Sequence, residues 1–257
     1  MSDHVRVEMK GALMSITLAR PERRNAITVS MYSALADAVE QAAADSAVRL
    51  IVFRGDGPDF TAGNDLADFL EASNRGGEEI PVWRFLRAIA ACETPLIAAV
   101  HGNCVGIGTT LLLHCDLVIA EGGTRFSLPF VDLGLVPEAA SSLLLPRLAG
   151  RRIAARYLLL CEPFGIDEAL SIGLVSHRAP AGELEPTVRR IVEQLLAKPP
   201  QALTAAQRLL RREMGDEILE RMRLESGIFA ERLASAEVKE AITAFFEKRK
   251  PDFTKSD

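Results

Sequence analysis

Apolar and polar positions alternate at the start of the chain. Residues 5–9 (VRVEM) and 13–18 (LMSITL) show the two-residue period of half-buried strands, and the short gap between them predicts a hairpin. Thr28 precedes a segment with helical apolar spacing, which predicts a capped helix over residues 29–44. Apolar runs typical of buried strands then alternate with helical segments to about residue 125. This half is therefore predicted to be α/β with a largely parallel sheet.

The pattern changes after Pro137, where helical periodicity dominates and strand signals are few. The change predicts either a second domain or a helical layer that joins subunits. The expected helices cover residues 138–147, 150–160, 183–197, 200–213 and 216–248.

Composition narrows the classes of protein. The 257 residues are 48% hydrophobic and 25% charged, which is typical of a globular protein in water. The net charge of -5 and the lack of a basic run argue against nucleic-acid binding. No apolar run reaches the length of a signal peptide or a membrane span, so we expect a cytoplasmic protein without membrane contact.

The cysteines and histidines do not form a metal-binding pattern. The four cysteines contain no C-x-x-C pair, and the four histidines show no H-x-x-x-H spacing. We therefore expect free thiols in a reducing compartment and no metal site.

Two glycine-rich turns are candidates for chemistry. Residues 101–110 (HGNCVGIGTT) lack the lysine of a phosphate loop and the glycine spacing of a dinucleotide site. Residues 59–69 (DFTAGNDLADF) place Gly63 before Asn64 and Asp65. Both turns would expose partly positive backbone N–H groups, and together these suit one developing negative oxygen. The alternative interpretation of residues 101–110 is close strand–helix packing, and that of residues 59–69 is a capped loop.

A single carboxylate, Glu138, lies in the segment LGLVPEAASS, residues 133–142. Taken alone, this segment is typical of a helix start. Pro137 suits the first turn of a helix, and glutamate is favoured near the positive end of the helix dipole. The segment by itself does not decide whether Glu138 has a further role.

Five segments, in this order and spacing, resemble the crotonase superfamily of enoyl-CoA hydratases and isomerases. The resemblance covers nearly the whole chain. It implies a spiral core of β-β-α turns over residues 1–195, and a helical C-terminal region over residues 196–257 that builds homotrimers or homohexamers. The five segments are RPERRNAIT (20–28), FTAGNDLADF (60–69), AAVHGNCVGIGTTLLLHCDLVIA (98–120), FSLPFVDLGLVPEAASS (126–142) and AFFEKRK (244–250).

The resemblance also implies an acyl-CoA substrate and no separate cofactor, since CoA is part of the substrate. The N–H groups of Asn64 and Ile107 would bind the thioester oxygen. Arg23 and Arg24 would lie by the CoA phosphates. Phe245 and Lys248 in the tail would reach the CoA of a neighbouring subunit. The alternative for the two arginines is a solvated charged turn, and the alternative for the tail is an ordinary basic helix end. The implied CoA-binding residues are Arg23, Arg24, Ala26, Ala62, Gly63, Asn64, Asp65, Leu66, Gly106, Phe245 and Lys248.

Two departures from the family pattern bear on the reaction. Family hydratases hold water between two glutamates, at positions where this chain has Thr110 and Phe130. Neither side chain is a general base near neutral pH. The Glu138 segment resembles instead the peroxisomal-type Δ3,Δ2-enoyl-CoA isomerases, in which the glutamate after the proline is the catalytic base. Glu138 would then move a proton from C2 to C4 of a 3-enoyl-CoA, in an apolar setting that excludes water and raises its pKa.

Other functions stay open at this point. A hydrolase or dehalogenase would use a carboxylate at the same corner, and a 2-enoyl-CoA hydratase would use the same CoA site. A non-catalytic binder of CoA thioesters is the alternative from another class of protein.

Overall fold

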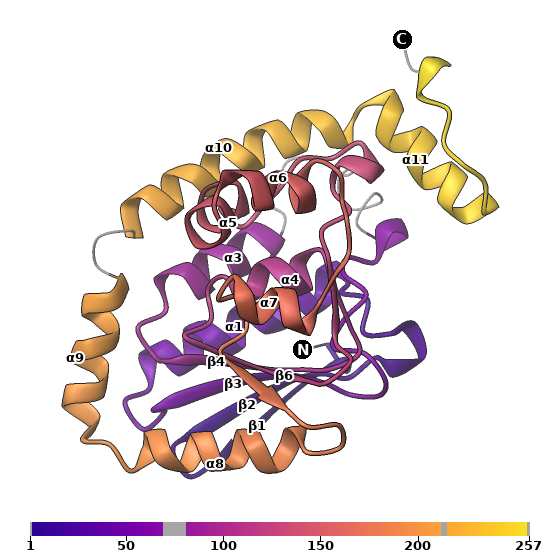
Figure 1. The fold of residues 1–257 in the computed structure, drawn as a ribbon. Coiled ribbons are helices and arrows are strands. Elements are labelled where there is room, and N and C mark those ends of the chain that lie inside the picture. The colour runs from indigo at the N-terminus through magenta and orange to yellow at the C-terminus, as the bar shows by residue number, and fades with distance from the viewer. Residues whose placement is uncertain (1, 69–80, 212–214, 256–257) are drawn as a thin grey trace.

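A six-stranded sheet lies at the centre of the computed structural model, which describes residues 2–68, 81–211 and 215–255 (Figure 1). The predicted hairpin is confirmed, because β1 and β2 pair antiparallel with Val5 opposite Leu18. Every other neighbouring pair in this sheet is parallel, which confirms the predicted α/β class. In order across the sheet, the strands are β1 (Val5–Lys10), β2 (Leu13–Leu18), β3 (Leu50–Gly55), β4 (Leu96–Val100), β6 (Leu117–Glu121) and β9 (His177–Ala179).

A second, three-stranded sheet consists of β5 (Asn103–Val105), β7 (Arg125–Ser127) and β8 (Phe164–Gly165). The chain passes from β4 to β5, and from β6 to β7, before it reaches the next helix. These are the β-β-α turns that the resemblance implied. The second sheet matters for the site, because β5 leads directly into the turn that contains Gly106 and Ile107.

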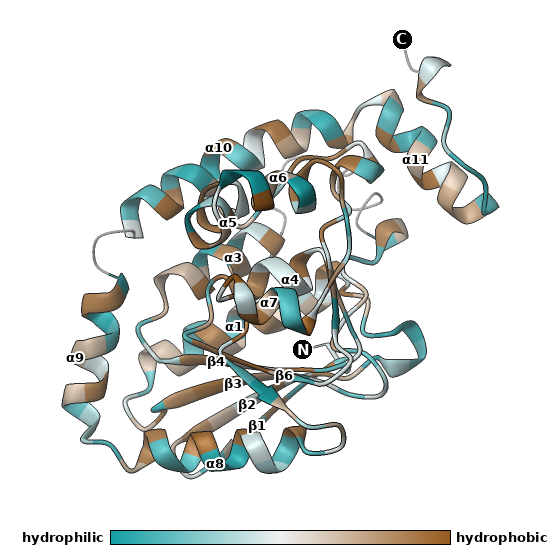
Figure 2. Cartoon of the chain, viewed as in Figure 1, coloured by the Kyte–Doolittle hydropathy of each residue, from teal (hydrophilic) through white to brown (hydrophobic). Residues whose placement is uncertain are grey.

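Helices cover both faces of the large sheet (Figure 1). On one face, α8 (Leu184–Leu196) packs Val188 and Ile191 against β3, β4 and β6. The other face carries α1 (Val29–Ala44), α3 (Pro81–Ala91) and α4 (Ile107–Leu112), with α10 (Gly215–Leu233) further out. Burial on both faces explains why β3 and β4 are nearly continuous apolar runs, and Figure 2 shows the strands as mainly hydrophobic.

The predicted cap of α1 is confirmed, since the Thr28 side chain accepts a hydrogen bond from the Met31 N–H at 3.3 Å. The remaining helices are α5 (Ser141–Ala149), α6 (Arg151–Leu158), α7 (Ile166–Ser171), α9 (Pro200–Arg211) and α11 (Ala236–Glu247), with short 3₁₀ turns η1 (Pro21–Arg23), η2 (Val131–Leu133) and η3 (Phe253–Lys255).

Three expectations for the C-terminal half were wrong. The region after Pro137 is not purely helical, because it contains the short strands β8 and β9, and it also has one helix that was not expected, α7. The helix expected over 138–147 begins only at Ser141, after two residues in left-handed conformation. The helix expected over 216–248 is two helices, because the Ser235 side chain accepts from the Val238 N–H and starts α11. The division at residue 195 falls in the last turn of α8 and stays a prediction.

No helix within the described ranges is long and apolar enough to cross a membrane. The four cysteines are unpaired; Cys92, Cys104 and Cys161 are buried and Cys115 is half-buried. In the same described ranges, no three His, Cys, Asp or Glu side chains gather in a way that could hold a metal ion.

Candidate active site

The two glycine-rich turns lie side by side. Thr61 forms a parallel bridge with Cys104, through hydrogen bonds of 3.1 Å from Thr61 N to Asn103 O and from Val105 N to Thr61 O. Glycine permits this approach. A Cβ on Gly63, whose φ is +89°, would lie 3.0 Å from the Val105 carbonyl oxygen. The two turns therefore present their ends to the same space.

The backbone N–H groups of Asn64 and Ile107 are available to a ligand. Ile27 bonds to the residues on either side of Asn64, so the Asn64 N–H points away from Ile27. Ile107 is the first residue of α4 and has no acceptor within its helix. Throughout the described residues, neither N–H has a hydrogen-bond acceptor in the protein. Their predicted role as oxyanion donors is open to test.

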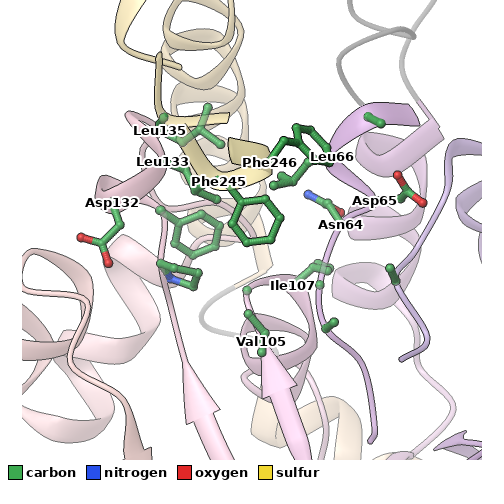
Figure 3. Close-up of a pocket in the computed structure, with 18 of the residues that line it drawn as sticks. Asn64, Asp65, Leu66, Val105, Ile107, Asp132, Leu133, Leu135, Phe245 and Phe246 are labelled. Carbon is green, nitrogen blue, oxygen red and sulfur yellow. The ribbon is translucent and has the colours of Figure 1, made fainter. Parts of the chain in front are cut away.

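Both residues line a cavity of about 800 Å³ (Figure 3). Its size is within the range of small-molecule sites. Its apolar lining includes Phe130 and Leu135, and the side chains of Phe245 and Phe246 from α11 stand over it at the rim. The cations in the lining are Arg20, Arg23 and Arg249. An apolar interior with a cationic border suits a ligand that has an apolar end and an anionic end.

Most of the implied CoA-binding residues come together here. The cavity is lined by Arg23, Ala26, Ala62, Gly63, Asn64, Asp65, Leu66, Gly106 and Phe245. Arg24 and Lys248 are not in the lining: the exposed Arg24 guanidinium lies 3.8 Å from Asp59, and Lys248 is the left-handed residue that ends α11. Phe245 lines the cavity of its own chain, whereas the resemblance implied the CoA of a neighbouring subunit.

Two arginines of the lining were not predicted. Arg20 donates to an Asp65 carboxylate oxygen at 2.8 Å and to the Ala26 carbonyl at 3.0 Å, which ties together two walls of the cavity. Burial acts to raise the pKa of Asp65, but hydrogen bonds, first of all that from Arg20, outweigh it and lower the pKa. Arg249 is held by Glu240 at 2.5 Å. Both arginines belong to segments quoted for the resemblance, and Arg249 directly follows Lys248.

Glu138 lies in a buried turn, three residues after Leu135 of the cavity lining, and is not itself one of the lining residues. The turn is held from two sides. The His114 Nε2–H donates to the Ala139 carbonyl at 2.7 Å, and the carboxylate of Glu225 accepts from the Ala140 N–H at 2.6 Å and the Ser142 N–H at 3.0 Å. Glu225, not Glu138, thus caps α5. The interpretation of Glu138 as a helix-start residue is wrong in this respect.

The two carboxyl oxygens of Glu138 have different surroundings. Oε1 accepts a hydrogen bond of 2.5 Å from the Thr110 hydroxyl. Oε2 is buried and has no hydrogen-bond partner among the described residues. Burial raises the pKa of Glu138 to about 8; the Thr110 hydrogen bond acts to lower it, and the charge of Glu225 acts to raise it. Oε2 is therefore the oxygen that is free to take a proton.

Thr110 links this carboxylate to the cavity, because it lies on the same short helix as Ile107. The other family position, Phe130, is buried in the cavity lining. Leu133 also lines the cavity, whereas Val136 does not. On α1, the buried Tyr32 hydroxyl donates to the side-chain oxygen of Asn64.

Comparison with known proteins agrees with this geometry. The family model "Enoyl-CoA hydratase/isomerase" matches residues 8–256. Crotonyl-CoA hydratase of Syntrophomonas wolfei is 33% identical over 254 residues, 98% of each chain. The 1,2-epoxyphenylacetyl-CoA isomerase of Escherichia coli is 30% identical over 262 residues, 99% of each chain.

A solved structure agrees as well. The crystal structure of an enoyl-CoA hydratase/isomerase from Pseudoalteromonas atlantica T6c superposes with a TM-score of 0.92 at 42% identity, and the match covers 98% of this chain and 100% of that one. With a family match over nearly its whole length and the fold to go with it, this chain belongs to the enoyl-CoA hydratase/isomerase family of the crotonase superfamily.

Proposed function

We propose that the chain is an enoyl-CoA isomerase, which moves the double bond of a 3-enoyl-CoA to the C2 position with Glu138 as its only base. The observation that carries this proposal is the pair of unlike oxygens on Glu138. Thr110 holds Oε1, and Oε2 is buried without a partner in the described chain. A carboxylate held in this way can take up a proton without a water molecule between it and the substrate.

In the proposed reaction the thioester oxygen accepts hydrogen bonds from the Asn64 and Ile107 N–H groups. Glu138 removes a proton from C2, and the electron pair moves into the thioester to form an enolate that these donors stabilise. The same carboxyl then gives its proton to C4, while the double bond forms between C2 and C3. One proton leaves C2 and one arrives at C4, so the reaction needs no further reactant.

The positions of the remaining acids favour isomerisation over hydration. A hydratase needs one group to activate water and another to supply a proton. Of the described residues that line the cavity, those with carboxylates are Asp65 and Asp132. Asp65 is paired with Arg20, and the exposed Asp132 carboxylate points away from Asn64 and Ile107 in Figure 3. Glu225 uses both of its oxygens on backbone N–H groups.

A comparison of two CoA esters tests the proposal. We expect trans-3-hexenoyl-CoA to be isomerised faster than crotonyl-CoA is hydrated, because Thr110 and Phe130 stand where hydration needs acids. The absorbance of the conjugated 2-enoyl thioester follows both reactions. Faster hydration of crotonyl-CoA would overturn the assignment, and hydrolysis of either thioester would favour the hydrolase alternative.

The second-order rate constant kcat/KM is expected to rise with pH through about 8, the pKa to which burial raises Glu138. Only the ionised carboxylate accepts the C2 proton, so activity falls as this group becomes protonated at lower pH. Measurement from pH 6 to 9.5, with the fold checked at each pH, gives the midpoint. A profile that is flat over this range would contradict the role of Glu138 as base.

We also propose that CoA lies along the cavity lining described above and that Arg20 and Arg249 join Arg23 near its phosphates. A trimer or hexamer and a cytoplasmic location remain part of this proposal. Exposed leucines on α9 and α10, at Leu209, Leu210 and Leu224, support contact with further subunits.

A further inference from the structure

Glu225 occupies an unusual place for an acidic residue. It is 5% exposed and lies on the apolar face of α10, between the buried Met222 and Phe229. Its two oxygens reach across to the start of α5, where they accept the N–H groups of Ala140 and Ser142. Burial raises the pKa of Glu225, and these hydrogen bonds act to lower it. The protein therefore holds an acidic side chain in its interior, hydrogen-bonded to the turn that contains Glu138.

The N–H groups that Glu225 takes are those two and four residues after Glu138. The start of a helix carries a partial positive charge and attracts the nearest carboxylate, and such hydrogen bonds lower the pKa of a carboxyl group. With Glu225 in place, these donors are occupied. Glu138 is left with the Thr110 hydroxyl on one oxygen and no partner in the described chain on the other.

The groups that face the two glutamates come from three elements. Arg221 on α10 lies near the start of α5, with its guanidinium 3.4 Å from the Ser142 hydroxyl. Burial raises the pKa of Glu225, and the charge of Arg221 acts to lower it. Tyr32 on α1 lies close enough to Glu138 for the carboxylate charge to raise its pKa, in addition to burial. His114 follows α4 and is neutral, because burial lowers its pKa to about 4.

We infer that Glu225 is a positioning residue for Glu138: it occupies the N-terminal N–H groups of α5, so that the Glu138 carboxylate stays unpaired and ready to accept a substrate proton. This inference rests on the proposed role of Glu138 as the base. It assigns to the C-terminal helical region a part in proton transfer, although α10 contributes no acid or base to the cavity lining as described.

The test measures the titration of Glu138 directly, by NMR of protein labelled with ¹³C at the glutamate carboxyl carbon. The Glu138 signal is the one that a Glu138→Gln variant lacks. Glu225→Gln keeps the size of the side chain, removes its charge and gives up one acceptor. We expect the titration midpoint of Glu138 to fall by about one pH unit or more in this variant. The acid limb of the kcat/KM profile should move in the same direction.

Two further variants make the result specific. Glu231→Gln removes one charge from an exposed position on the same helix and should leave the Glu138 midpoint unchanged. Glu225→Asp keeps the charge but withdraws it from the two N–H groups by one methylene, and should lower the midpoint by less than Glu225→Gln does. An unchanged Glu138 midpoint in whichever Glu225 variant folds would overturn the inference, even if that variant is less stable.

The same data separate this inference from the proposed function. A midpoint that shifts in Glu225→Gln, in a protein that does not isomerise 3-enoyl-CoA, would support the link between the two glutamates and reject the isomerase assignment. Isomerase activity, together with an unshifted Glu138 midpoint in Glu225→Gln, would support the isomerase assignment and reject the link between the two glutamates.

Discussion

Replacement of Glu138 by glutamine is expected to lower kcat by about 10²- to 10⁴-fold, the usual contribution of a general base. Glutamine keeps the shape of the side chain and still accepts the Thr110 hydrogen bond, but it does not take a proton from C2. Binding of the CoA ester should hardly change, because the oxyanion donors are backbone groups and the arginines of the cavity lie elsewhere. Loss of turnover with retained affinity marks a role in the transition state.

The measurement combines turnover of 3-hexenoyl-CoA with calorimetric affinity for hexanoyl-CoA, which is not isomerised. Glu183→Gln serves as the control, since Glu183 is exposed and its side chain makes no cap at the start of α8. Near-normal turnover in the Glu138 variant would remove this residue from the mechanism and reopen the hydrolase and binder alternatives.

The effect of Glu138→Gln on stability should be opposite in sign to the effect of neutralising a carboxylate at a helix start. Because burial raises the folded-state pKa of Glu138 to about 8, its contribution to stability is complete below its ordinary pKa and is lost as pH rises through 8. The melting temperature of Glu138→Gln, relative to the unaltered protein, should therefore increase between pH 5 and pH 9. Neutralisation of a carboxylate at a helix start would instead lower the stability of the protein by about 0.3–1 kcal/mol.

Removal of one oxyanion donor is expected to reduce kcat by about 10²- to 10³-fold. Ile107→Pro achieves this, because proline lacks the N–H and is tolerated at the first position of a helix. No intrahelical hydrogen bond is lost at this position, since Ile107 begins α4. The comparison is with Ile107→Val, which keeps the N–H and also shortens the buried side chain.

Turnover and melting temperature of the two Ile107 variants show whether the Ile107 N–H acts as an oxyanion donor. If Ile107 supplies a donor, the valine variant stays near normal while the proline variant loses activity at a similar melting temperature. Equal turnover in both would show that this N–H does not take part, and would leave Asn64 as the remaining predicted donor.

The long, regular elements could be predicted because their periods extend over many residues. The β1–β2 hairpin and α1 with its Thr28 cap are examples. The strands β5, β7, β8 and β9 have two or three residues each, too few to show a period, and they form only because neighbouring strands lie beside them. The break between α10 and α11 had a local signal, Ser235 followed by Glu237, but the apolar helical spacing continues across it.

Some residues of the candidate site could likewise be predicted from the sequence, and others could not. The two glycine-rich turns could be predicted to be turns because glycine is typical of turns, and the structure places them side by side. Glu225 lies 83 to 85 residues from the N–H groups that it binds, so no local pattern connects them. One signal was present: Glu225 interrupts the apolar stripe of α10, whose other buried members are Ile218, Met222, Phe229 and Leu233. A lone acid on such a stripe indicates a buried partner elsewhere in the fold.

The walls of the cavity come from opposite ends of the chain. Arg20 to Ala26 form one side, and Phe245 to Pro251 complete the other. The ribosome synthesises a chain from its N-terminus, and a domain generally folds as a unit. The two glycine-rich turns and Glu138 are therefore synthesised well before the last segment that lines the cavity. A nascent chain that already contains the glycine-rich turns and Glu138 still lacks the aromatic rim and Arg249, so the lining of the cavity is incomplete until residues 245–251 have been added.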